Sequence, residues 1–198
     1  MRMKKSYIVV GVIVLAIVWL VVICVGTYNK MVASDETVAT EWSKVEAQYQ
    51  RRSDLIPNLV STVKGYAAHE QSTLDAVVSA RARATQITLS ADNLTEENLA
   101  AFQAAQGELS GALSRLLALS ENYPDLKANQ NFLELQAQLE GTENRIAVAR
   151  SRYSEAVRDY NVMIRRFPAS IVASIGGFFP KPQFAASAGA ETAPVVSF

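Results

Sequence analysis

The feature that most constrains this chain is a run of nineteen uncharged residues, from Tyr7 to Val25. A bilayer core about 30 Å thick needs about 20 apolar residues when each adds 1.5 Å to a helix. The run is longer than the apolar part of a secretory signal peptide, and no small-residue cleavage site follows it. The sequence therefore predicts an uncleaved transmembrane anchor over residues 1–28, which contacts the lipid bilayer through residues 6–26.

The charges around the anchor predict its orientation. Arg2, Lys4 and Lys5 precede the apolar run, whereas basic and acidic residues are mixed in the segment after it. Because basic flanks stay in the cytoplasm, we predict a single-pass protein of a bacterial-type cytoplasmic membrane, with its N-terminus cytoplasmic and its bundle extracytoplasmic. The excess is small, so a cytoplasmic bundle is the alternative. Without these three residues acidic side chains outnumber basic ones, and we predict no nucleic-acid partner.

The segment after the anchor predicts an all-α fold. It is rich in Ala, Leu, Gln, Glu and Arg, which favour helices, and it lacks the alternating pattern of strands. We predict an antiparallel up-and-down bundle over residues 29–167, with three long helices at about 34–88, 95–122 and 129–167. Short connections between long helices place them as antiparallel neighbours.

The first predicted helix carries an apolar seam with spacings of four and three residues, which is typical of a helix packed against a partner. Its residues are Val38, Trp42, Val45, Tyr49, Arg52, Ile56, Leu59, Val63, Tyr66, Glu70, Thr73, Val77, Ala80, Ala84 and Ile87. Pro57 has no N–H for the helical ladder, but the seam keeps its phase across it. We therefore predict one kinked helix. The alternative is a break at Pro57, with Ser53 or Asp54 capping a fourth helix.

Polar residues predict where the other two helices begin. Thr95 is typical of an N-cap, and the two glutamates that follow it suit the first turn of a helix. Asn131 with Glu134 resembles a capping pair for the last long helix.

A different composition begins after the bundle. Residues 168–184 predict a short apolar helix followed by an aromatic strip that contains Phe178, Phe179 and Phe184. The strip either packs along the bundle or contacts the membrane or a partner through exposed aromatic rings. Residues 185–198, rich in Ala, Ser, Gly and Thr, predict a disordered tail.

Several local motifs resemble those of the LemA family. They are Gln50-Arg51-Arg52-Ser53-Asp54-Leu55-Ile56-Pro57-Asn58-Leu59-Val60, Val63-Lys64-Gly65-Tyr66, Tyr123-Pro124-Asp125-Leu126-Lys127-Ala128-Asn129, Glu143-Asn144-Arg145-Ile146-Ala147-Val148-Ala149-Arg150, Tyr160-Asn161 and Arg165-Arg166-Phe167-Pro168. Together with the single N-terminal span, this resemblance covers residues 5–184. It implies a membrane-anchored helical bundle without a settled biochemical activity. Some members are associated with membrane proteolysis, so the resemblance implies membrane proteins, including proteolysis machinery, as possible partners.

The sequence contains few of the residue patterns that enzymes need. His69-Glu70 begins like a zinc metalloprotease helix, but Thr73 stands where the second histidine would be, and His69 is the only histidine. A strained Gly-x-Ser-x-Gly turn and a phosphate-binding loop are also missing from the sequence. We therefore predict a protein that is not an enzyme and has no catalytic, cofactor or metal site.

Charged residues on the apolar seams are the main candidates for a functional site. Arg52 and Glu70 lie on the first seam, and Glu143 and Arg150 lie on the last one. Because an unpaired buried charge costs several kcal/mol, we expect these four to form inter-helix polar layers that fix the register of the helices. In the alternative, local rotation moves them to a solvated face. The same choice applies to Arg51, Arg165 and Arg166, which either contact lipid headgroups or face water.

These observations leave three classes of function. The first is a structural scaffold or adaptor that presents its bundle to membrane proteins or to copies of itself. The second is an oligomeric assembly that organises or remodels the membrane. The third, which we rank last, is an enzyme that uses the Glu and Arg residues of the seams.

Overall fold

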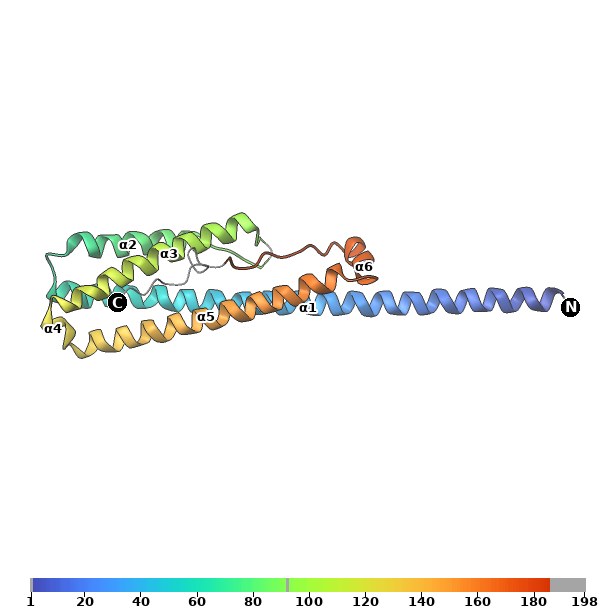
Figure 1. Cartoon of the computed structure of the whole chain (residues 1–198), viewed down its shortest axis with the longest axis horizontal. Coiled ribbons are helices and arrows are strands. Elements are labelled where there is room, and N and C mark those ends of the chain that lie inside the picture. Colours follow the sequence, from blue (N-terminus) through green and yellow to red (C-terminus); the bar gives the residue numbers. More distant parts are fainter. Residues whose placement is uncertain (1, 92, 186–198) are drawn as a thin grey trace, which may run out of the picture. The chain divides into compact units, whose positions relative to one another are not determined.

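The structure is a computed structural model that describes residues 2–91 and 93–185, with side chains from residue 7 onward. The predicted tail lies outside the described residues, except for Ala185. The helices are α1 (Arg2–Tyr66), α2 (Gln71–Gln86), α3 (Glu96–Ala118), the 3-10 turn η1 (Leu119–Glu121), α4 (Pro124–Lys127), α5 (Gln130–Arg165) and α6 (Ala169–Gly176) (Figure 1). No strand occurs in the described ranges, so the prediction of an all-α chain is confirmed.

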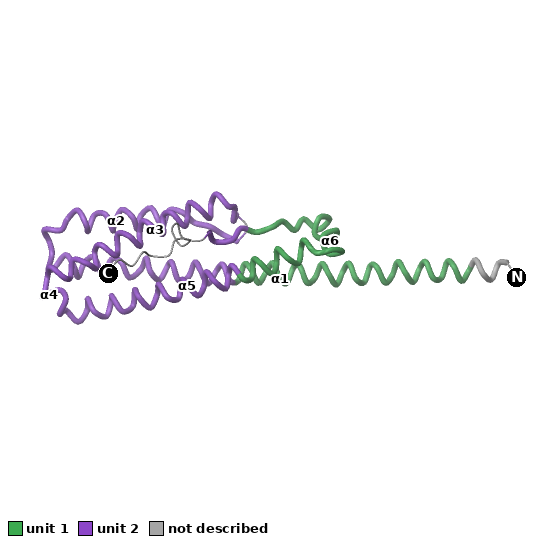
Figure 2. The backbone as a smooth tube through the Cα atoms, in the orientation of Figure 1, with its two compact units in different colours: residues 1–40, 155–181 green, residues 41–154, 182–198 purple. Residues whose placement is uncertain are grey.

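The chain divides into two compact units (Figure 2). Unit 1 consists of Met1–Thr40 and Glu155–Lys181, and unit 2 consists of Glu41–Ser154 and Pro182–Phe198. Helices α1 and α5 each contribute residues to both units.

Unit 1 contains the apolar segment of α1. Its large side chains from Tyr7 to Val22 are more than half exposed, and none of its most apolar 18-residue window is buried. A helix that is apolar on all sides suits lipid rather than water. The segment is long and apolar enough to cross a membrane, as the sequence predicts.

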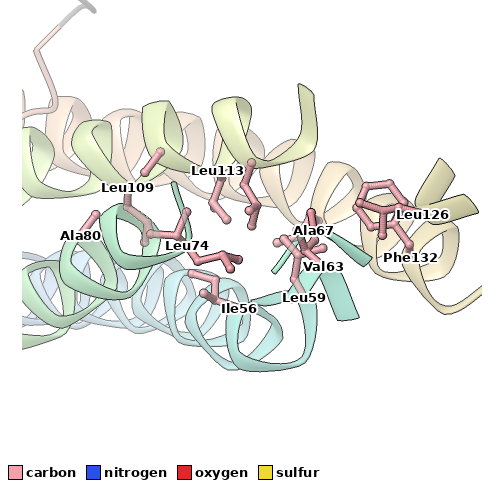
Figure 3. Packing of buried hydrophobic residues seen from close by; sticks show 14 of the residues in the cluster. Ile56, Leu59, Val63, Ala67, Leu74, Ala80, Leu109, Leu113, Leu126 and Phe132 are labelled. Atoms are coloured by element: carbon pink, nitrogen blue, oxygen red, sulfur yellow. The ribbon is translucent and has the colours of Figure 1, made fainter. Parts of the chain in front are cut away.

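Unit 2 is a bundle in which parts of α1, α2, α3 and α5 run alternately up and down (Figure 1). Its core brings together branched and aromatic side chains from these helices and from α4, as Figure 3 shows. One cluster of buried residues contains Ile56, Leu59, Val63, Ala67, Leu74, Val77, Ala80, Ala84, Leu109, Ala112, Leu113, Leu116, Leu126, Phe132 and Leu139. Burial of this apolar surface is the main force that holds such a bundle together.

The prediction of one helix over residues 34–88 is wrong. Helix α1 continues through Pro57 but ends at Tyr66, and the chain folds back at Ala67–Glu70 into α2. The bundle therefore has four long helical segments rather than three. Buried residues recur on both sides of this turn, with Val63 before it and Val77 after it, although the predicted seam residue Tyr66 is itself 43% exposed. Spacing reports which face of a helix is apolar, but it does not report whether the chain reverses direction.

The predicted N-cap of α3 is confirmed, because the Thr95 side chain accepts a hydrogen bond from the backbone N–H of Asn98. The cap of α5 differs from its prediction. Asn129, not Asn131, caps this helix by accepting a hydrogen bond from the N–H of Phe132 at 2.9 Å. The spacing is the same, but the helix begins two residues earlier than the predicted pair requires.

Candidate functional site

Arg52 is the charged residue that the fold of unit 2 buries most completely. It occupies a seam position of α1, and its side chain is only 2% exposed. Its Nη1 donates to the Ser110 hydroxyl at 2.8 Å and to the Glu143 carboxylate at 2.7 Å. Its Nη2 donates to the side-chain oxygen of Gln106. A single guanidinium therefore links α1 to α3 and to α5.

The charge of Arg52 is balanced by a carboxylate that remains partly in water. The Glu143 side chain is 47% exposed, so the ion pair lies at the edge of the core. Burying a guanidinium without a partner would cost several kcal/mol, whereas water screens an exposed pair strongly. We conclude that the neutral hydrogen-bond acceptors on α3 and the carboxylate on α5 together make this position possible.

A cleft of about 510 Å³ lies next to this ion pair. Its walls include Tyr49, Arg52, Glu143, Arg150 and Ala185. The guanidinium of Arg150 lies over the ring of Phe184, 4.5 Å from its centre. Burial raises the pKa of the Tyr49 phenol, although the nearby guanidinium groups of Arg150 and Arg52 act in the opposite direction. The cleft thus combines two cations, one anion and an aromatic wall.

Glu70, the remaining predicted seam charge, lies in the turn between α1 and α2. Its carboxylate accepts a hydrogen bond from the Tyr123 hydroxyl at 3.0 Å, and this bond raises the pKa of the phenol. In a second contact, the amide of Asn129 donates to the Tyr66 hydroxyl at 2.8 Å. The two bonds connect this turn to the segment around α4. The structure therefore pairs Arg52 with Glu143, places Arg150 in the wall of the same cleft, and leaves Glu70 in a separate contact with Tyr123.

Pro57 acts through the carbonyl that it leaves free. A proline cannot donate to the carbonyl four residues before it, which here belongs to Ser53. In the structure the Nε of Arg81 donates to that carbonyl at 2.9 Å. Arg81 comes from α2, so the free carbonyl becomes a link between two neighbouring helices of the bundle.

The predicted aromatic strip separates into different environments. In unit 2, the ring of Phe184 lies 5.3 Å from Tyr153 and 6.1 Å from Trp42. In unit 1, the ring of Phe178 packs edge-on against Tyr28 at 5.3 Å, whereas Phe179 is 75% exposed. Two of the three rings thus pack against protein, and only Phe179 presents its ring to the surroundings.

The other motif residues have identifiable local positions. Asn161 forms two hydrogen bonds with the backbone of Lys181, donating to its carbonyl at 2.8 Å and accepting from its N–H at 2.9 Å. Asp54 accepts from Gln50, and Pro124 begins α4. Arg51, Asn58, Arg165, Arg166, Phe167 and Pro168 are exposed.

Sequence reasoning missed the partners of the charged residues. Ser110 and Arg81 lie off the predicted seams, and no spacing rule connects them to Arg52 or Pro57. Gln106 lies among the apolar residues that form the buried face of α3, and its polar character there was the available signal. Among the residues whose side chains are described, no three His, Cys, Asp or Glu side chains lie close enough together to hold a metal ion.

Comparison with known proteins places this chain in a family. The model of the LemA family matches residues 41–198. The magnetosome protein MamQ 2 of Paramagnetospirillum magneticum is 26% identical, over 93% of this chain and 74% of its own length. MamQ of Magnetospirillum gryphiswaldense is 27% identical, over 83% and 67%. The protein LemA of Metamycoplasma hominis is 23% identical, over 75% and 64%. The chain belongs to the LemA family.

Proposed function

We propose that this protein is a membrane-anchored, non-enzymatic scaffold or adaptor that acts through its helix bundle. The observation that carries the proposal is the character of α1. Its residues 7–25 expose apolar side chains on all sides, and the same helix supplies buried core residues such as Trp42 and Leu59. A single helix thus serves both as an anchor and as part of a folded domain. We also propose a cytoplasmic N-terminus in a bacterial-type cytoplasmic membrane.

The contacts of the charged residues support a structural role. The guanidinium of Arg52 is used in bonds to α3 and α5, and Glu70 is bonded to Tyr123. Such contacts stabilise one arrangement of the helices. We therefore assign these residues to the architecture of the bundle and propose that its outer surface meets the partners.

One part of that surface is a cleft of about 330 Å³ in unit 2, with Val148 among its lining residues. Val148 is 51% exposed, although it is apolar. Charged neighbours surround it, including Lys44, Arg145 and Arg152. An apolar centre with a polar rim resembles the anatomy of protein interfaces. We propose membrane proteins, including proteolysis machinery, or copies of this chain as the occupants.

Crosslinking in native membranes tests the proposal. A photoreactive amino acid at Val148, or at the exposed Val78 as a second position, is activated in cells and its products are identified by mass spectrometry. We expect discrete adducts with particular membrane proteins or with the chain itself. Only diffuse products at every bundle position, in cells where the chain is folded and membrane-bound, would contradict a scaffold.

A second candidate function is an assembly that organises the membrane. It is supported by the similarity to MamQ proteins, whose names place them with magnetosomes. Mild detergent extraction followed by size analysis tests it. A large homo-oligomer, together with altered membrane shape in electron micrographs of expressing cells, would favour this function over an adaptor. A monomer with heterologous neighbours would favour the adaptor.

A further inference from the structure

Unit 1 carries a group of exposed apolar side chains around its short C-terminal helix. Ile171 and Ile175 lie one turn apart on α6, and Phe167 and Phe179 flank the helix on either side. Ile175 and Phe167 are 84% and 83% exposed, and the other two are also more than half exposed. Single exposed apolar residues are ordinary, but a group of this kind marks a surface that contacts something apolar.

The position of α6 next to α1 indicates what that surface meets. Phe178 packs edge-on against Tyr28, with ring centres 5.3 Å apart. The approach is close, because a Cβ atom at Gly176 would lie 3.1 Å from the Tyr28 ring. Tyr28 comes three residues after Val25, which corresponds to about 4.5 Å along a helix axis. The contact therefore fixes α6 beside the end of the apolar segment of α1 (Figure 2).

Basic side chains lie at the same end of unit 1. Lys30 and Arg166 line a cleft of about 350 Å³ together with Thr27 and Ala169. Neither basic residue forms an ion pair within the described part of unit 1. Exposed Arg165 precedes Arg166. Cations at the end of a membrane segment are attracted to the phosphates of lipid headgroups.

We propose that α6, with Phe167 and Phe179, is a second membrane contact that lies in the headgroup region of the bilayer crossed by residues 7–25. Its apolar side chains enter the upper acyl region, and Lys30 and Arg166 bind headgroup phosphates. Helices with one apolar face and nearby basic residues bind membranes in this way. The inference rests on the proposed function only in that residues 7–25 cross the membrane.

Depth-dependent fluorescence quenching tests this contact in the full chain. Cys24 is replaced by serine, and one new cysteine at Ile175 carries an environment-sensitive fluorophore. The labelled protein is reconstituted in vesicles of phosphatidylcholine with phosphatidylglycerol. Quenchers are placed at the headgroup level, deep in the acyl chains, or in water. The matched control is Leu133→Cys, at an exposed apolar position of unit 2 outside the proposed partner cleft, and Leu15→Cys reports the anchor.

We expect headgroup-level quenching at position 175, deep quenching at position 15 and quenching from water at position 133. If position 15 is quenched by lipid but position 175 behaves like position 133, the surface contact is refuted while the anchor stands. If position 15 also fails to meet lipid, the anchored scaffold is refuted as well. Protection of position 175 from every quencher would instead indicate a protein occupant and would overturn the proposal.

A second set of variants tests the chemistry of the contact. With the fluorophore at Phe179→Cys, Ile175→Glu should decrease the headgroup-level quenching, whereas Leu133→Glu, at an exposed position of unit 2, should leave it unchanged. Lys30→Gln with Arg166→Gln should weaken it in vesicles that contain phosphatidylglycerol, and the difference should shrink in pure phosphatidylcholine. Equal quenching in all variants with an unchanged circular dichroism spectrum would overturn the assignment of these residues.

Discussion

Helix α1 contains two stretches, residues 7–25 and residues 38–63, whose apolar side chains are distributed differently and suit different surroundings. In the first stretch apolar side chains point in every direction and remain exposed. In the second stretch buried residues recur every three or four positions, and polar residues occupy the remaining faces. Both patterns satisfy the backbone through the same helical hydrogen bonds. The distribution of apolar side chains, rather than helix formation, decides which part suits lipid and which part packs against protein.

The largest expected effect comes from placing charges in the first stretch. Ile13→Asp with Ile17→Asp should cost about 6 kcal/mol of insertion free energy, at about 3 kcal/mol for each acidic residue near the centre of a span. We expect the chain to move from the membrane fraction to the soluble fraction on alkaline extraction. Val78→Asp with Val148→Asp, at exposed apolar positions of unit 2, should leave it in the membrane. If the chain with Ile13→Asp and Ile17→Asp stayed in the membrane fraction, the distinction between a lipid-facing stretch and a protein-facing stretch of α1 would be lost.

The next effect concerns the buried charge in the second stretch. Arg52→Leu should lower the free energy of unfolding by about 3 kcal/mol, because it leaves buried acceptors and Glu143 without their partner. Thermal unfolding in detergent, followed by circular dichroism, measures the change. Arg51→Leu is the matched control, since the neighbouring Arg51 is exposed. Glu143→Gln should cost less, about 0.5 kcal/mol, because the carboxylate is half in water. Equal melting of the Arg52 and Arg51 variants would show that the buried contact does not stabilise the bundle.

A smaller effect tests the role of Pro57. Arg81→Met should cost about 1.5 kcal/mol, because it removes the donor to the free carbonyl of Ser53. In a Pro57→Ala background the helical ladder is restored, so the same substitution should cost less, with a coupling energy of about 1 kcal/mol. Arg83→Met breaks an exposed ion pair with Glu108 and serves as the control, for which we expect no coupling. If the free-energy costs of Arg81→Met and Pro57→Ala were additive, the proposed link between Arg81 and the free carbonyl of Ser53 would be contradicted.

The smallest effect is pH-dependent. Burial raises the pKa of Tyr153 from 10.0 to about 12, so the folded state keeps the phenol proton that the unfolded chain would lose. The corresponding stability is complete below pH 10 and is lost as the pH rises through 12. Tyr153→Phe should cost about 1 kcal/mol at neutral pH, through the lost bond to the Pro182 carbonyl.

The same variant should flatten the decline in melting temperature between pH 10 and 12. Tyr160 in unit 1, whose pKa burial and Asp35 also raise to about 12, should account for part of the remaining slope. An unchanged pH profile in the Tyr153→Phe chain would show that this phenol does not titrate with unfolding.

The sequence predicts most of the helices because spacing and capping are local signals. Val38 through Val63 are buried as their spacing requires, and Thr95 caps α3 as its chemistry requires. The turn after Tyr66 is missed because apolar residues recur at helical spacing on both sides of it. Of the two alternatives for the aromatic strip, exposure applies to Phe179, whereas Phe178 and Phe184 pack against partners that lie far away in the chain.

The candidate site is predicted only in part for a related reason. Arg52 and Glu143 stand out as charges on apolar seams, but their pairing depends on which helices become neighbours. The contact between Arg81 and the Ser53 carbonyl is even harder to predict from the sequence, because the sequence predicts α2 as a continuation of the same helix. Local composition identifies unusual residues, whereas the order of helices in space identifies their partners.

The guanidinium of Arg52 has a mechanical consequence. One planar group holds a hydroxyl and an amide on α3 and a carboxylate on α5 at the same moment. Sliding α1 along α3 and α5 would break all of these bonds together, so small displacements of α1 meet a steep resistance. A force applied to α1 is therefore transmitted to α3 and α5 through this one side chain.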